Sequence, residues 1–118
     1  MDLTGYVKVG DLGAVSQSQP LVLVHDGYRI AIYYDQNNYY AIEDICPHMG
    51  AFISNGYQEG NLVICPWHNW EFELSTGKCV KPVNDSSIKV FPLKIYDNSF
   101  WLPTMLFEEN EGEFEDWV

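Results

Sequence analysis

Two short segments hold four of the chain's six cysteine and histidine residues, and they constrain the fold more than any other feature. The first pairs Cys46 with His48, and the second pairs Cys65 with His68. In both segments a proline follows the cysteine, which fixes φ and removes an amide donor. An apolar run precedes each segment, so both sit where a strand is expected to end. The chain must therefore bring two loops to face each other.

The rest of the chain reads as short strands joined by turns. No segment shows helical periodicity over a useful length, and six prolines and nine glycines interrupt the chain at intervals typical of strands. The pattern favours an all-β sandwich or barrel. The expected strands are 21–25, 29–35, 39–45, 62–65, 70–74, 88–91, 93–96 and 99–102.

Length and charge narrow the class further. A chain of 118 residues suits one domain. The net charge of −11 argues against nucleic acid and against anionic membrane surfaces, and it fits a basic protein partner. No basic, apolar leader is visible and no apolar run is long enough to span a bilayer, so we expect a cytoplasmic protein. Three cysteines are too few for a disulfide scaffold.

The end of the chain differs from the rest. We expect a domain over residues 1–106 and an acidic tail over residues 107–118. A solvated end is favoured, while Phe114 and Trp117 leave open a docking tail with apolar anchors. The acidic residues are Glu108, Glu109, Glu111, Glu113, Glu115 and Asp116.

Three explanations compete for the paired segments. Ordinary buried residues account poorly for two matching Cys and His pairs. Zinc accepts two sulfurs and two nitrogens, but structural zinc sites usually pair C-x-x-C with two histidines. The third explanation is a [2Fe–2S] cluster in which two histidines replace two cysteines on one iron.

The paired motif resembles the Rieske signature, C-x-H followed after sixteen residues by C-x-x-H. The similarity covers roughly residues 5–103. It implies one [2Fe–2S] cluster per chain, held by four residues that are both its cofactor-binding and its metal-ligating residues. It also implies an antiparallel β-sandwich with a small cluster-binding β subdomain. By this resemblance Cys46 and Cys65 bind the inner iron, and His48 and His68 bind the outer iron.

Departures from the respiratory branch of that family indicate the branch. Respiratory members carry a second cysteine in each loop, and here Ala51 and Trp67 occupy those positions, so no bridging disulfide can form. Trp70 and Phe72 replace a serine and a tyrosine whose hydroxyls favour reduction. We therefore expect a potential toward the low end of the roughly −150 to +300 mV range. The chain is similar to the soluble, ferredoxin-type branch.

Several further residues have open roles. The resemblance places Pro82 in the loop that covers the cluster, and Trp67 either shields the cluster or simply packs. Met49, beside His48, is expected near an exposed tip where it makes an apolar docking contact. Cys79 lies outside the motif and is interpreted as a buried free thiol. His25, with no partner cysteine, is expected on a surface turn.

The resemblance implies a one-electron carrier between a flavoprotein reductase and a terminal oxygenase. The alternative is a small subunit of an assimilatory nitrite reductase or of another multi-component oxidoreductase with a larger reductase subunit. A zinc-stabilised binding module is the alternative of a different class. An oxygenase acting alone is disfavoured, because no histidine follows Asn69 to build a second iron site.

Overall fold

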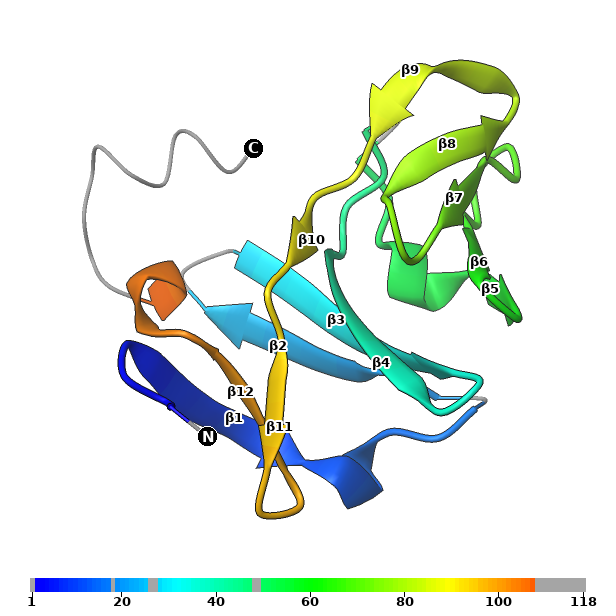
Figure 1. The fold of residues 1–118 in the computed structure, drawn as a ribbon. Coiled ribbons are helices and arrows are strands. Elements are labelled where there is room, and N and C mark those ends of the chain that lie inside the picture. The colour runs from blue at the N-terminus through cyan, green and yellow to red at the C-terminus, as the bar shows by residue number, and fades with distance from the viewer. Residues whose placement is uncertain (1, 18, 26–27, 48–49, 108–118) are drawn as a thin grey trace.

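The structure is a computed structural model, and it describes residues 2–17, 19–25, 28–47 and 50–107. Within these ranges the chain forms strands and 3-10 turns and contains no α-helix, as Figure 1 shows. None of the described helices is long and apolar enough to cross a membrane. The 3-10 turns are η1 (Leu12–Ala14), η2 (Ile53–Asn55) and η3 (Thr104–Phe107). The strands are β1 (Tyr6–Asp11), β2 (Leu21–His25), β3 (Tyr28–Asp35), β4 (Asn38–Glu43), β5 (Tyr57–Glu59), β6 (Leu62–Ile64), β7 (Glu71–Glu73), β8 (Lys78–Lys81), β9 (Val83–Ser87), β10 (Val90–Phe91), β11 (Lys94–Tyr96) and β12 (Ser99–Pro103).

Two antiparallel sheets form a sandwich. One has the order β1-β12-β11 and the other the order β10-β4-β3-β2. Strand β3 lies between two cores, because successive side chains of a strand point to opposite faces. Ile30 and Ile32 lie in the core between the sandwich sheets, whereas Ala31 and Tyr33 lie in a second core. The sandwich therefore buries β3 on both sides and uses it as a common wall.

The second core belongs to a subdomain inserted between two neighbouring strands of the sandwich. Strands β4 and β10 pair directly, with Ala41 opposite Phe91, although residues 44–89 lie between the two strands in the sequence. The intervening chain forms a five-stranded sheet in the order β5-β6-β7-β8-β9, seen beside the sandwich in Figure 1. Both cysteine segments lie in this insertion.

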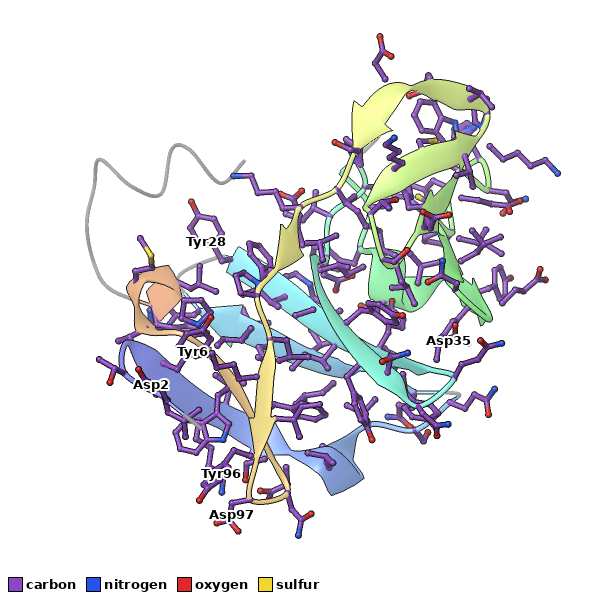
Figure 2. All side chains as sticks on the ribbon, viewed as in Figure 1. Asp2, Tyr6, Tyr28, Asp35, Tyr96 and Asp97 are labelled. Carbon is purple, nitrogen blue, oxygen red and sulfur yellow. The ribbon has the colours of Figure 1, made fainter. Side chains whose placement is uncertain are left out.

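The end of the sandwich away from the subdomain carries its own exposed aromatic side chains. Tyr96 and Asp97 lie at the turn between β11 and β12, as Figure 2 shows. The Lys94 ammonium sits 4.2 Å from the centre of the Tyr6 ring, and it donates a 2.6 Å hydrogen bond to the Asp2 carbonyl oxygen. These contacts link strand β11 to the start of β1, and neither cysteine segment takes part in them.

The predicted all-β class with antiparallel sheets is confirmed. Eight expected strands are present, but β4 ends at Glu43, two residues early, where the chain turns into the first cysteine segment. Four strands were missed, because their sequences are short or polar. These are β1, β5, β8 and β9.

The division into a domain and a tail stays a prediction. Residues 108–118 lie outside the described residues. Phe107, expected to begin the tail, packs against the sandwich core, with its ring centre 5.4 Å from that of His25. The folded part therefore reaches at least one residue beyond the expected boundary.

Candidate metal centre

Two loops of matching construction carry the cysteines. In the first cysteine loop (residues 46–51) the Cys46 amide donates to the Ala51 carbonyl oxygen at 2.8 Å. In the second cysteine loop (residues 65–70) the Cys65 amide donates to the Trp70 carbonyl oxygen, also at 2.8 Å. Each loop is thus closed by the same hydrogen bond between its first and sixth residues, so each cysteine is held where its loop starts.

The fifth position of each loop requires a left-handed backbone. Gly50 has φ +74° in the first loop, and Asn69 has φ +57° in the second. Glycine adopts this region freely, and asparagine adopts it more readily than most residues. His68, just before Asn69, also has a positive φ of +65°. The local sequences therefore fit the two turns that the loops make.

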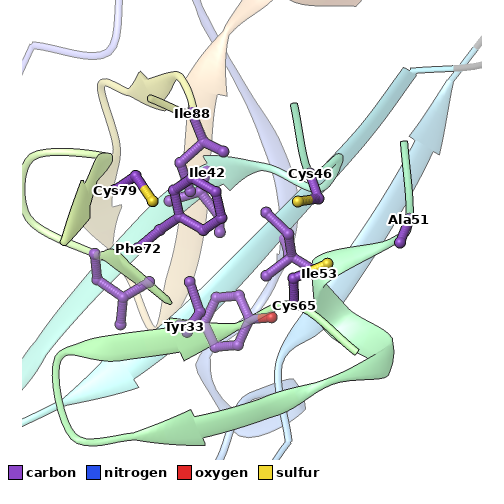
Figure 3. Packing of buried hydrophobic residues seen from close by; sticks show 12 residues of the cluster. Tyr33, Ile42, Cys46, Ala51, Ile53, Cys65, Phe72, Cys79 and Ile88 are labelled. Atoms are coloured by element: carbon purple, nitrogen blue, oxygen red, sulfur yellow. The ribbon is translucent and has the colours of Figure 1, made fainter. Parts of the chain in front are cut away.

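The thiols of Cys46 and Cys65 are fully buried and contact each other. Figure 3 shows both at the edge of the subdomain core. Burial raises the pKa of the Cys65 thiol to about 11, and the hydrogen bond and charge of Cys46 add to the shift, while the Trp67 amide opposes it. The two thiols face each other, and the raised pKa keeps the Cys65 thiol protonated at neutral pH. A cationic centre between them would bind them as thiolates.

His68 lies on the exposed side of the second loop. Among the described residues, no three cysteine, histidine or acidic side chains converge on one point that could hold a metal ion. The structure thus brings Cys46 and Cys65 together but does not place His68 with them around a single ion. His48 and Met49 lie outside the described residues.

An open depression of about 600 Å³ lies beside His68. Pro82 is exposed and lines the same depression. The Lys81 ammonium approaches the Glu71 carboxylate at 3.9 Å and joins the Pro82 segment to strand β7. The predicted shielding role of Pro82 stays a prediction.

Trp67 projects from the second loop and is 51% exposed. It lines a second depression, of about 390 Å³, which lies between the two cysteine loops. Phe52, 40% exposed, lines the same depression. Trp67 therefore presents an apolar surface next to the candidate metal centre, and its predicted shielding of the cluster stays a prediction.

Asp44, which sequence reasoning missed, is a fully buried acid two residues before Cys46. Its carboxylate accepts hydrogen bonds from the Ser54 amide at 2.7 Å and the Ser54 hydroxyl at 2.6 Å. It also pairs with Arg29 Nε at 3.3 Å. Its neighbour Glu43 is also acidic, so no sequence signal singled out Asp44.

The sequence also gave no indication of a buried tyrosine beside the second cysteine. Tyr33 packs in the same core as Cys65, and Figure 3 shows its hydroxyl directed toward that cysteine. Burial, and to a lesser extent the charge of Asp44, raises the pKa of Tyr33 well above its usual range. Phe72 is fully buried and provides no hydroxyl, as the sequence indicates. The hydroxyl that faces Cys65 instead comes from β3, far away in the sequence.

Cys79 is a buried free thiol outside the two loops, as predicted. Its Sγ lies 3.2 Å from the Pro82 carbonyl oxygen and 3.5 Å from the Asn84 side-chain amide. These contacts pin the turn between β8 and β9. Cys79 provides an internal comparison for the two loop cysteines.

A model of the Rieske [2Fe–2S] domain matches residues 5–92. The chain therefore belongs to the Rieske [2Fe–2S] family, and it binds a [2Fe–2S] cluster, as the sequence predicted. The family match favours the cluster over zinc and over ordinary buried residues.

Within this family the chain is similar to the ferredoxin component of the naphthalene 1,2-dioxygenase system of Pseudomonas putida. The two are 30% identical over 76% of this chain and 86% of that protein. The predicted ferredoxin branch is thereby confirmed.

Two solved structures share the fold. The Sphingomonas yanoikuyae B1 ferredoxin has a TM-score of 0.76 and 22% identity, and the match covers 82% of this chain and 96% of that one. A protein described as an NADPH nitrite reductase small subunit has a TM-score of 0.70 and 23% identity, over 82% and 96% of the two chains. The predicted antiparallel β-sandwich with a small β subdomain is thereby confirmed as the Rieske fold.

Proposed function

We propose that this protein is a one-electron carrier that passes electrons from a flavoprotein reductase to a terminal oxygenase. The observation that carries the proposal is the pair of buried, facing thiols on two matched loops, in a family that binds [2Fe–2S]. When bound, the cluster takes up and releases one electron at a time. A flavin that has gained two electrons therefore reduces two molecules of the carrier.

The chain's residues divide this task by burial. Cys46 and Cys65 hold the inner side of the site, where no water reaches. We propose that His48 and His68 hold the outer side, and His68 is exposed. An exposed imidazole gives the electron a short path to a docked partner. Neutral imidazoles in place of two thiolates also remove two negative charges, which makes the uptake of an electron easier.

Two observations support the choice of partners. The Pseudomonas putida relative is named as the ferredoxin component of a dioxygenase system. The net charge of −11 favours partners that present a basic surface. We further propose that the carrier works in the cytoplasm, where its three free cysteines stay reduced.

The alternative is a small subunit of a nitrite reductase or of another multi-component oxidoreductase, supported by the likeness to a nitrite reductase small subunit. The two functions differ in assembly. A carrier leaves its partners after each transfer, whereas a subunit co-purifies with a larger reductase subunit in constant ratio. Size-exclusion chromatography of the protein from its native cells separates the two.

The ligand set is tested by single substitutions in reconstituted protein. We expect Cys46→Ser and Cys65→Ser to lose the cluster, measured as iron and sulfide per chain. We expect His48→Ala and His68→Ala to lose the histidine-type EPR signal of the reduced protein. Cys79→Ser is the matched control, because Cys79 is also buried but lies outside the loops. It should retain two irons and two sulfides per chain.

Two results would contradict the proposal. Wild-type protein that takes up no iron and sulfide after anaerobic reconstitution would exclude the carrier function. An unchanged EPR signal in both histidine variants would mean that other residues complete the site.

A further inference from the structure

A charge pair lies directly before the first cysteine loop. Asp44 is fully buried, and the Arg29 side chain is 21% exposed. Arg29 Nε lies 3.3 Å from Asp44 Oδ2, and the Asp44 amide donates to the Arg29 carbonyl oxygen at 2.9 Å. The two residues are thus joined through side chains and backbone at the ends of strands β3 and β4.

Asp44 also accepts hydrogen bonds from the segment that follows the first cysteine loop. The Ser54 amide donates to Asp44 Oδ1 at 2.7 Å, and the Ser54 hydroxyl donates to Oδ2 at 2.6 Å. Ser54 lies in η2, three residues after the loop ends. One carboxylate therefore fastens the segments that enter and leave the first cysteine loop. Three hydrogen-bond donors therefore converge on one buried carboxylate.

Arg29 is held in place by a second contact. Its guanidinium carbon lies 3.8 Å from the centre of the Phe52 ring, in a cation–π arrangement. Phe52 immediately follows the loop. The positive charge of Arg29 and the negative charge of Asp44 are therefore both held against residues 52–54, the segment that directly follows the loop.

The charge of Asp44 reaches the core that contains the thiols. Asp44 contributes to the raised pKa of Tyr33, which packs in one core with Cys46 and Cys65. A charge with no contact to water is screened weakly, so Asp44 acts on groups in the neighbouring core that its carboxylate does not touch. An electron added near Cys46 meets repulsion from Asp44 and attraction from Arg29.

We propose that Asp44 and Arg29 form a positioning pair that fixes the first cysteine loop and sets the reduction potential of the cluster through their opposed charges. The inference rests on the proposed function, because it needs a bound cluster. Neither residue contacts the reacting atoms, and each acts through the loop and through its electric field.

The test measures the fraction of reduced protein in Asp44→Asn, in Arg29→Gln and in the double variant. Each reconstituted sample is poised at the wild-type midpoint, where half of the wild-type protein is reduced. Asp44→Asn keeps the shape and removes the negative charge, so more than half of it is reduced. Arg29→Gln removes the positive charge, so less than half of it is reduced. The double variant returns close to half.

Asp35→Asn is the matched control. Asp35 is another buried aspartate, and it ends β3, the strand that begins next to Arg29. Asp35 lies six positions along β3 from Arg29, a distance of about 20 Å. Figure 2 shows Asp35 at the β3–β4 turn, and its substitution should leave half of the protein reduced.

Opposite shifts in the two single variants support the pair as a tuning device. Shifts in the same direction in the two single variants would overturn the proposal and leave only a structural role. The same holds if the variants bind less iron but their cluster-containing molecules keep the wild-type potential. Should Arg29→Gln fail to fold, an unchanged potential in Asp44→Asn is sufficient to overturn it. These results differ from failure of the carrier proposal, which shows as wild-type protein without a cluster.

Discussion

Gly56 lies where the chain leaving the first cysteine loop passes closest to the second. A Cβ at this position would collide with the Ile64 carbonyl oxygen and come within 3.0 Å of Pro66. The close approach to Ile64 requires a glycine at this position. The residue thus keeps strand β6 and the start of the second loop against η2.

We expect Gly56→Ala to lower the free energy of unfolding by at least about 2 kcal/mol, since overpacked sites have no room to relax. The Ile64 carbonyl is fixed in strand β6 and cannot retreat. Thermal denaturation of cluster-free protein measures the loss. Gly13→Ala is the control, because nothing lies within 4 Å of its Cβ and its φ is not positive. Equal melting temperatures for the two variants would show that the close approach is absent in solution.

At the scale of single residues, the sequence pointed to the predicted cluster ligands more readily than to the buried residues that surround them. Cys46 and Cys65 were found from their spacing, because metal ligands recur in short motifs. Asp44 and Tyr33 were not, because their importance comes from burial beside a loop that is distant in the sequence. A buried carboxylate with three donors and an exposed one look the same in a sequence.

The two cysteine loops are the elements on which the site depends. At the described positions, the two loops share the same closing hydrogen bond and a left-handed fifth residue. The sequence predicted these loops, since C-P and a nearby glycine mark tight turns. It did not predict β9, whose sequence is polar and which forms because β8 offers it a partner.

Gly50→Ala tests the first cysteine loop as an element. Its φ of +74° makes alanine unfavourable by about 1 kcal/mol, although no described atom lies within 4 Å of the added Cβ. Gly5→Ala is a matched control, with φ +80° and equally open surroundings in the sandwich. We expect similar losses of stability in the two cluster-free variants.

Only Gly50→Ala should then release the cluster faster, because only its strain falls within a loop that holds a proposed ligand. The decay of visible absorbance in the presence of an iron chelator measures this release. Equal decay rates for the two glycine variants would argue that the first loop adapts without affecting the site.

At the scale of the whole molecule, the architecture separates stability from function. The sandwich closes around its own core, and the inserted segment between β4 and β10 carries both cysteine loops beside a second core. The sequence indicated an all-β class from short apolar runs and turns. The subdomain was implied only by family resemblance, and its insertion between β4 and β10 was not predicted, because pairing between distant strands leaves no local signal.

Docking of a redox partner depends on the surface of the whole molecule. Trp67 and Tyr96 are both 51% exposed, but Trp67 lies beside the cysteine loops and Tyr96 at the far end of the sandwich. If partners dock over the loops, Trp67→Ala should slow reduction by the reductase about tenfold, the effect of losing one aromatic anchor of about 1.4 kcal/mol. Tyr96→Ala should leave the rate within about twofold.

Stopped-flow reduction over a range of salt concentrations separates the apolar anchor from the overall charge. The net charge of −11 should make the rate fall with added salt for a basic partner, with the same slope in wild type and both variants, because neither aromatic residue is charged. An equal slowing by Tyr96→Ala would move the docking site away from the loops. A rate that does not change with salt would mean that the acidic surface does not steer the partner, and docking would then depend on the apolar contacts around Trp67.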